Sequence, residues 1–297
     1  MRYALGMLTA MAVTVAISSV GETLSLEVPG AELEKIADGL SFGEGPAADA
    51  EGNVYFADIP NMLVKKWRLD GTVTTVRENS GRANGLMFDK AGDLIACEMG
   101  GRRISKQTSD GTVTTIADRC GGKRFNQPND LWIDAKGGIY FTDPIYGSVE
   151  GGEEAGGRHV YYIAPDGKVV RAAEGFKNPN GIVGTPDGKT LYVADHAGEA
   201  TYAFDIGADG ALSSRRKIIN RGSDGMTLDE KGNLYLTAKE NVEIFAPNGK
   251  LLQTIETPER TTNVTFGGKD RKTLFITCPS SVYAIDMTVR GAKAAWE

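Results

Sequence analysis

Short apolar runs separated by polar turns recur along most of this chain. A typical run holds four or five residues rich in Val, Ile, Tyr and Phe, as in NVYFADI (53–59) and GIYFTDP (138–144). Such runs are too short for ordinary helices, and they carry the residue types that favour strands. The pattern therefore predicts an all-β protein built from many short strands.

The runs belong to a repeated unit in which a polar residue precedes a short strand, a polar turn and a second apolar strand. The six units begin at Glu44, Asn84, Asn129, Asn180, Asp224 and Asn263. Their starts lie 39 to 51 residues apart, the length of one four-stranded blade. A second hairpin follows, with Asp-Gly or Asn-Gly turns in 159–170, 200–213 and 242–255. The sequence therefore predicts a six-bladed β-propeller with four-stranded blades.

The last unit is too short to supply four strands by itself. Only 34 residues follow Asn263, which is enough for about three strands. The stretch TLSLEVPG (23–30) precedes the first unit and has alternating strand character. We expect it to complete the last blade, which would close the ring and remove its open edge.

The six polar starts are candidates for one common site. The first strand of each propeller blade lies innermost, so these residues converge at one end of the central channel. Any one of them could be only a turn, because Asn and Asp before Gly are common in turns. Glu44 is a poor turn former yet takes the equivalent place. Carboxylate and amide oxygens suit hard divalent cations, so we predict a metal site at that end of the channel.

Further polar groups are expected around the same end. The second strands finish at Asp58, Glu98, Asp143 and Asp195, which we expect to add acidic side chains around the ring. The Gly-rich loop 146–159 is longer than the other loops. We predict that it reaches over the ring and influences the choice of substrate.

Composition and the N-terminal segment indicate which kinds of partner and which cell compartment to expect. The formal net charge is -6 and the basic residues are scattered, so nucleic acid is not an expected partner. Residues 1–20 have the plan of a secretory signal peptide, with an uncleaved membrane anchor as the alternative. We expect cleavage, a single propeller domain over 21–297, and an exported protein, periplasmic or secreted, without stable membrane association. Three cysteines leave at least one unpaired.

At these residues the chain resembles the SMP-30/gluconolactonase family, also called regucalcin-like. The matching stretches between residues 42 and 278 are FGEGPAADAEGNVYFADI, GKRFNQPNDLWIDAKGGIYFTDPIYG, NPNGIVGTPDGKTLYVAD, GSDGMTLDEKGNLYLTA and TTNVTFGGKDRKTLFIT. The run PND…FTDPIYG is most similar to the gluconolactonase branch. The resemblance implies one divalent cation in the channel, Ca²⁺ in the first place and Mg²⁺, Mn²⁺ or Zn²⁺ otherwise. It implies metal ligands at Glu44, Asn129, Asn180 and Asp224.

The resemblance also implies hydrolysis of a small-molecule lactone, in the first place a sugar lactone. The cation would polarise the lactone carbonyl, and Asp224 would act as the general base toward water. Asn129 and Asn84 would orient the substrate hydroxyls. Animal regucalcins carry a substrate-contacting Arg two residues before the position of Asn129, where this chain has Gln127, so their substrate preference does not transfer. Two alternatives stay open: organophosphate or ester hydrolysis on the same metal site, and a non-catalytic ligand-binding propeller.

Overall fold

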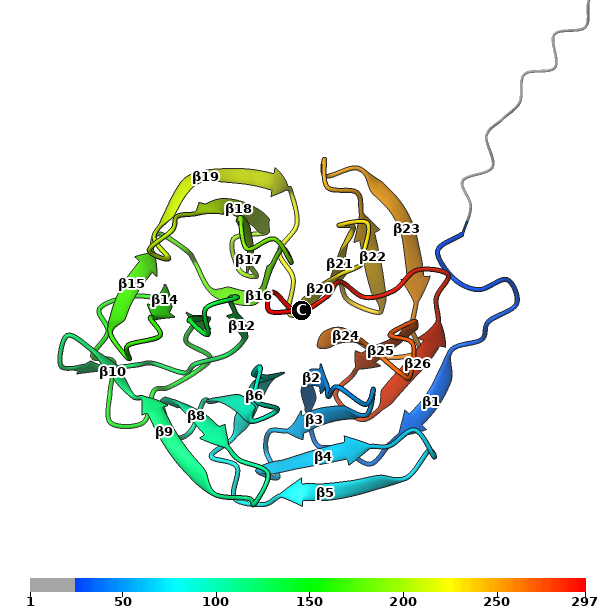
Figure 1. Cartoon of the computed structure of the whole chain (residues 1–297), viewed down its shortest axis with the longest axis horizontal. Coiled ribbons are helices and arrows are strands. Elements are labelled where there is room, and N and C mark those ends of the chain that lie inside the picture. The colour runs from blue at the N-terminus through cyan, green and yellow to red at the C-terminus, as the bar shows by residue number, and fades with distance from the viewer. Residues whose placement is uncertain (1–24) are drawn as a thin grey trace, which may run out of the picture.

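The computed structural model describes residues 25–297, so the predicted signal peptide (1–20) lies outside the described residues. Six four-stranded antiparallel sheets surround a central axis. In five of them the strands follow the chain from the inside outward, and in the sixth an N-terminal strand lies outermost. Figure 1 views the molecule along this axis. Within residues 25–297, no helix is long and apolar enough to cross a membrane. The predicted six-bladed β-propeller with four-stranded blades is confirmed.

Blades 1 to 3 follow one another along the chain. Blade 1 consists of β2 (Gly43–Ala48), β3 (Val54–Asp58), β4 (Leu63–Trp67) and β5 (Val73–Arg77). Blade 2 consists of β6 (Ala83–Phe88), β7 (Leu94–Glu98), β8 (Arg103–Gln107) and β9 (Val113–Ala117). A small hairpin, β10 (Arg119–Cys120) and β11 (Lys123–Arg124), then leads to blade 3. Blade 3 consists of β12 (Leu131–Ile133), β13 (Ile139–Asp143), β14 (His159–Ile163) and β15 (Val169–Ala173).

Blades 4 to 6 complete the circle. Blade 4 consists of β16 (Pro179–Gly184), β17 (Thr190–Asp195), β18 (Ala200–Ile206) and β19 (Leu212–Ile219). Blade 5 consists of β20 (Met226–Leu228), β21 (Leu234–Thr237), β22 (Asn241–Phe245) and β23 (Leu251–Glu256). Blade 6 consists of β24 (Asn263–Gly267), β25 (Thr273–Thr277), β26 (Val282–Asp286) and β1 (Glu34–Ala37).

The hydrophobic core lies between neighbouring blades rather than at the centre of the ring. For example, Cys97 and Ile104 of blade 2 pack with Phe141 and Tyr161 of blade 3 in one buried cluster. Burial of such large apolar side chains contributes about 1.5–3 kcal/mol each. The apolar runs of the sequence therefore hold the blades in place, and the channel is left to polar side chains.

The N-terminal strand that closes the ring is not the one predicted. β1 pairs with β26, through Glu34 opposite Ala284 and Lys35 opposite Tyr283, so an N-terminal segment does complete blade 6. The predicted stretch 23–30 is wrong as the closing strand: of its described residues only Glu27 forms a bridge, to Met287. The reason is the Pro-Gly pair that follows, since Pro lacks a donor and Gly30 adopts a φ of 80°. Figure 1 shows β1 beside β26.

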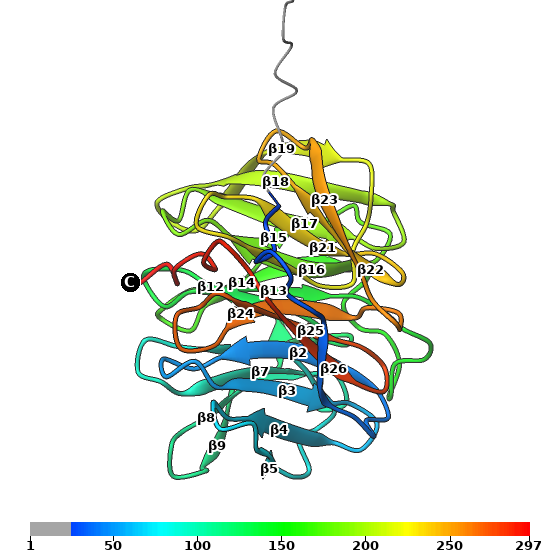
Figure 2. The same ribbon diagram turned by 90° about the vertical axis from the view of Figure 1, so that its right-hand side faces the viewer.

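The central channel has two mouths, and the inner strands start at one of them. A C-terminal segment, residues 288–297, runs across the opposite mouth. We call it the strap. Gly291 bridges to Asp229, and the amide of Ala292 donates to the carbonyl of Leu228. Farther along, Trp296 packs on the cluster between blades 2 and 3. Figure 1 shows that the C-terminus lies over the centre of the ring, and in Figure 2 it projects from one face.

Candidate active site at the channel mouth

Five of the six predicted ring residues lie together at one end of the channel. Glu44 is on β2, Asn84 on β6 and Asn180 on β16. Asn129 and Asp224 lie two residues before the inner strands of blades 3 and 5. All five side chains are buried. Contacts between neighbouring blades place them at a common level. The amide of Gly85 donates to the carbonyl of Asn129, and Asn180 Nδ2 lies 2.5 Å from Asp224 Oδ1.

The sixth predicted member, Asn263, lies one residue past the ring position of its blade. In blades 3, 5 and 6 the same hydrogen bond recurs, from the amides of Asp130, Gly225 and Asn263 to a threonine hydroxyl on the second strand. Asn263 therefore corresponds to Asp130, and Thr262 stands at the ring level of blade 6. The hydroxyl of Thr262 donates to the carbonyl of Gly43 instead of facing the channel. The expectation that Asn263 is a ring member is wrong.

One level deeper, the channel is constricted by polar side chains from two opposite blades. Blades 1, 2, 4 and 5 place glycines here, and a Cβ on Gly45 would meet the backbone of Asn84 at 1.8 Å. Blades 3 and 6 instead carry Asp130 and Asn263, whose side chains are both buried. We call this pair the septum. Asp130 is thus a buried group of the channel.

Three buried carboxylates share this small region. Burial raises the pKa of Glu44 well above its usual range, and the nearby charges of Asp224 and Asp130 raise it further. Burial likewise raises the pKa of Asp130 to about 7. For Asp224, burial raises the pKa, while the positive charges of His196 and Arg260 act in the opposite direction. Like charges held this close favour either protonation or a cation among them.

The orientation of Asn180 leaves an oxygen available for such a cation. A carboxylate oxygen can only accept, so the Asn180 atom 2.5 Å from Asp224 Oδ1 is the amide nitrogen. The carbonyl Oδ1 of Asn180 must therefore face elsewhere. Asn84 Oδ1 is also buried, and no hydrogen-bond partner for it is present among the described residues. Carboxylate and amide oxygens without sulfur or imidazole fit a hard divalent ion.

The metal-ligand set stays a prediction. No group of three or more His, Cys, Asp and Glu side chains in residues 25–297 is arranged to hold a metal ion. The predicted set has only two carboxylates, Glu44 and Asp224, and relies on neutral amides for the rest. These oxygen donors fit the predicted divalent cation.

The acids at the ends of the second strands do not face the site. Asp58 accepts the amides of Ser41 and Phe42, and Asp143 accepts those of Asn126 and Gln127. Asp195 accepts the amides of Lys177 and Asn178, and Glu98 forms ion pairs with Arg77 and Arg103. The expectation that these acids line the ring is therefore wrong. Three of them, Asp58, Asp143 and Asp195, bind the backbone that enters the inner strand of their own blade, because those buried amides need acceptors.

Two functional candidates have no clear signal in the sequence. Arg260 Nη2 lies 2.7 Å from Asp224 Oδ2, with half of its side chain exposed. Tyr146, at the start of the long loop, receives a hydrogen bond of 2.6 Å from Asn180 Nδ2. The loop therefore does reach the ring, as predicted. Tyr146 could have been found only through the unusual length of its loop, and Arg260 lies in an ordinary-looking connection between blades.

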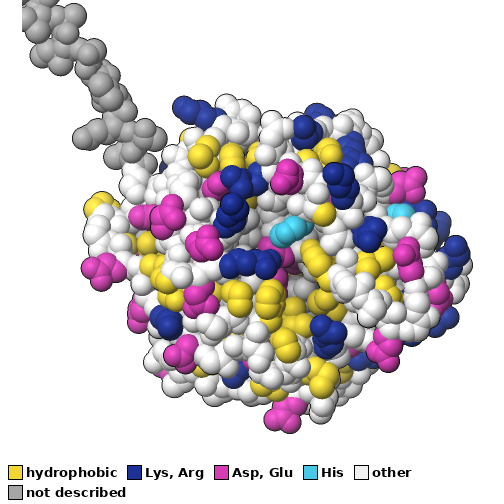
Figure 3. All heavy atoms as spheres, turned by 180° about the vertical axis from the view of Figure 1, so that it is seen from behind, with side chains coloured by type: hydrophobic (Ala, Val, Ile, Leu, Met, Phe, Trp, Pro, Cys, Tyr) yellow, Lys and Arg dark blue, Asp and Glu magenta, His cyan; other side chains and the backbone are white. Residues whose placement is uncertain are grey.

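The molecule has a small cavity at this mouth and a larger one at the other. His196, Asp224, Thr237, Lys239 and Arg260 border a cavity of about 320 Å³. Figure 3 shows a hollow on this face, bordered by a histidine and several basic side chains. A larger cavity of about 740 Å³ lies beyond the septum, under the strap. It contains none of the five ring residues, so we assign the chemistry to the smaller cavity.

Comparison with known proteins agrees with this geometry. A family model described as SMP-30/Gluconolactonase/LRE-like region matches residues 42–280. The chain belongs to this family. A member called gluconolactonase, from Zymomonas mobilis, is 31% identical over 287 residues, with 85% of this chain and 80% of the relative covered.

Two solved structures in the same comparison have the same architecture. A gluconolactonase from Xanthomonas campestris is 31% identical, with a TM-score of 0.82 and 90% of this chain and 93% of that one covered. A calcium-binding regucalcin from Agrobacterium tumefaciens is 19% identical, with a TM-score of 0.74 and 87% and 94% of the chains covered. The second likeness concerns the fold alone.

Proposed function

We propose that this protein is a lactonase that opens the ring ester of a sugar lactone. The observation that carries the proposal is the ring of buried carboxylates and amides at the mouth of a propeller of this family. Two relatives at 31% identity are gluconolactonases, which supports the reaction class. The sugar lactone is favoured because the ring offers several amide groups, which bind hydroxyl oxygens well.

A divalent cation, Ca²⁺ in the first place, is part of the proposal. Glu44, Asn129, Asn180 and Asp224 would hold it, and the mutual repulsion of the buried carboxylates favours its binding. When bound, such an ion supplies Lewis-acid polarisation of the lactone carbonyl.

The residues of the chain supply positioning and proton transfer. Asp224 Oδ2 is held by Arg260, which is half exposed and can move away. That oxygen can then take a proton from water as the water oxygen bonds to the carbonyl carbon. As the bond from carbonyl carbon to ring oxygen breaks, the proton passes to that oxygen, and the product is a hydroxy acid. Asn129 and Asn84 would orient the substrate hydroxyls. Among the described residues, the one hydrogen-bond partner of Asn84 Nδ2 is the sulfur of Met99 at 3.4 Å, a weak partner that a hydroxyl can replace.

The test is a proton-release assay on the metal-stripped protein. Glucono-1,5-lactone, δ-valerolactone, a phenyl ester and an organophosphate triester are each offered with and without Ca²⁺, Mg²⁺, Mn²⁺ or Zn²⁺. We expect the largest gain over the spontaneous rate with the sugar lactone and a cation. A preference for the triester would point to the alternative hydrolase. Rates at background with every substrate and cation would leave only a binding propeller.

We also propose that residues 1–20 direct export and are removed. The support is the order of the segment, with Arg2 followed by an apolar stretch and then small residues. Mass spectrometry of the protein from separated cell fractions tests this. A mature chain beginning near residue 21 outside the cytoplasm is expected. An intact N-terminus in the membrane fraction would support an anchor instead.

A further inference from the structure

The hydrogen bonds around Asn180 determine whether the Tyr146 hydroxyl is a donor or an acceptor there. Asn180 Nδ2 faces both Asp224 Oδ1 and Tyr146 Oη, at 2.5 and 2.6 Å. The carboxylate requires this atom to be the nitrogen, so Tyr146 Oη is the acceptor in its contact. The proton of the Tyr146 hydroxyl is therefore left for another partner. No acceptor for it is found among the described residues.

The loop holds Tyr146 in place through its backbone. Gln127 is buried, and its Oε1 accepts the amide of Tyr146 at 2.5 Å while its Nε2 donates to the carbonyl of Ser148 at 3.1 Å. Asn178 Oδ1 accepts the amide of Ile145, directly before the tyrosine. One step farther along the loop, Arg102 Nη1 donates to the carbonyl of Glu150 at 2.7 Å. The tyrosine is thus fixed on both sides, and little entropy is lost when it binds a ligand.

These bonds also show what Gln127 does. Both polar atoms of its amide bond to the loop, so the side chain of Gln127 is held as a support for the loop. The hydroxyl that reaches the ring from this side belongs to Tyr146 instead. Tyr146 is 38% exposed, while its hydroxyl contacts Asn180 of the ring.

We propose that Tyr146 is a substrate-positioning residue that donates its hydroxyl proton to a hydroxyl group of a polyhydroxylated lactone. The proposal rests on the lactonase function and specifies its substrate class. A lactone carbonyl near Glu44, Asn180 and Asp224 places the adjoining ring hydroxyls beside Tyr146. A site built to bond a hydroxyl disfavours a substrate without one, because its own polar group then stays unpaired.

The test compares two lactones in three forms of the cation-loaded protein: wild type, Tyr146→Phe and the control Tyr202→Phe. Tyr202 lies on β18 against Phe176 and Arg215, away from the ring. With glucono-1,5-lactone we expect Tyr146→Phe to lower kcat/KM roughly tenfold, chiefly through KM, as for loss of one hydrogen bond. With δ-valerolactone, which has no hydroxyl groups, Tyr146→Phe and wild type should match. Tyr202→Phe should match wild type on both substrates.

A second measurement does not require turnover. The product gluconate carries the same hydroxyl groups, and its binding is measured by calorimetry. We expect roughly tenfold weaker binding to Tyr146→Phe than to wild type. Unchanged gluconate affinity, or equal losses of kcat/KM on both lactones, would overturn the proposal. If wild type hydrolyses neither lactone, the lactonase function fails; gluconate that binds wild type and Tyr146→Phe equally refutes the role of Tyr146 independently.

Discussion

At the scale of single residues, the site is a balance of charge. Glu44, Asp130 and Asp224 are buried close together: the charge of Asp224 raises the pKa of both Glu44 and Asp130, and Asp130 raises that of Glu44. Within residues 25–297, the one ion pair to these carboxylates is that of Arg260 with Asp224. Asn84, Asn129 and Asn180 add oxygens without adding charge. This composition explains how two predicted carboxylate ligands could hold a divalent ion without leaving a large uncompensated charge in the channel.

Asp224→Asn tests the proposed base. The amide can still present an oxygen to a cation but cannot take a proton from water, so lactone hydrolysis should fall by at least about 100-fold. The rate is measured at saturating Ca²⁺, with binding of the ion verified by calorimetry. Full activity of the variant with its cation bound would exclude Asp224 as the base.

Arg260→Gln tests the competition between arginine and cation for Asp224. Because the Arg260 charge neutralises Asp224 in the cation-free protein, its removal should strengthen Ca²⁺ binding severalfold at low salt. Calorimetry measures this without reference to activity. Arg221→Gln is the matched control, since Arg221 borders the same cavity but pairs with Glu243. An equal effect of both variants would indicate only a general change in surface charge.

At the scale of elements, the ends of the second strands organise the entries to the inner strands. Asp58, Asp143 and Asp195 each accept two backbone amides from the segment that leads into the ring. In each case these amides lie two and three residues before the ring residue of the same blade. The acids therefore position the ring indirectly, by fixing the backbone from which its side chains project. An acidic residue at such a strand end therefore indicates a structural role, unless the backbone amides near it already have other hydrogen-bond acceptors.

Asp195→Ala tests this role. Loss of the carboxylate leaves the amides of Lys177 and Asn178 without their acceptor, so the free energy of unfolding should fall by about 2–4 kcal/mol. Asp205→Ala, on β18 of the same blade, removes an exposed acid paired with Arg216 and should change stability by less than about 0.5 kcal/mol. Urea unfolding measures both. Similar values for the two variants would contradict the role of Asp195.

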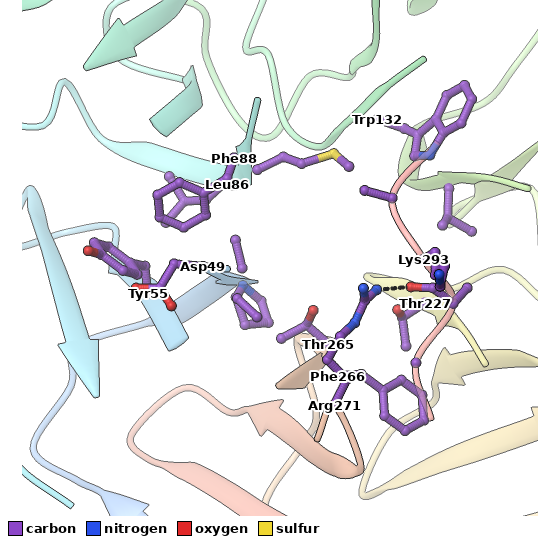
Figure 4. A pocket seen from close by; sticks show the side chains of 18 of the residues that line it. Asp49, Tyr55, Leu86, Phe88, Trp132, Thr227, Thr265, Phe266, Arg271 and Lys293 are labelled. Carbon is purple, nitrogen blue, oxygen red and sulfur yellow. Dashed lines mark hydrogen bonds between the residues drawn. The ribbon is translucent and has the colours of Figure 1, made fainter. Parts of the chain in front are cut away.

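At the scale of the whole molecule, the ring is closed by strands from both ends of the chain. β1 lies outermost in a blade whose other three strands come from residues 263–286. Closure of this kind removes the last open edge of the propeller. On the opposite face the strap covers the second mouth. Figure 4 shows Arg271 directed toward the strap, where it binds the carbonyl of Ala292, and Arg271 also pairs with Glu297. The septum and the strap together make the site accessible from one face.

Two truncations of the mature protein locate the closing strand. A chain that starts at Ala31 retains β1, whereas one that starts at Gly39 lacks it. Loss of β1 exposes the edge of β26, so the shorter chain should unfold roughly 10 °C or more below the longer one and associate in solution. Thermal unfolding and size-exclusion chromatography measure these effects. Equal stability of the two chains would show that β1 does not close the ring.

Much of the fold followed from local pattern because each blade is a local structure. Its four strands are neighbours in the chain, and the turns between them carry residues such as Gly167 and Gly249, with φ values of 84° and 82°. The closing strand was harder to find, because pairing of residue 34 with residue 284 leaves no local signal. There, a Pro-Gly pair decided where the strand could begin.

The sequence by itself determined the number of blades, the level of five ring residues and the oxygen-rich chemistry of the channel, because these repeat with the period of the blade. Only the tertiary structure decided which acids face inward and that Asn263 joins Asp130 in the septum. It also decided that Tyr146 and Arg260 reach the ring. These depend on contacts between blades, and a one-residue difference in register, as at Asn263, changes a side chain's surroundings completely.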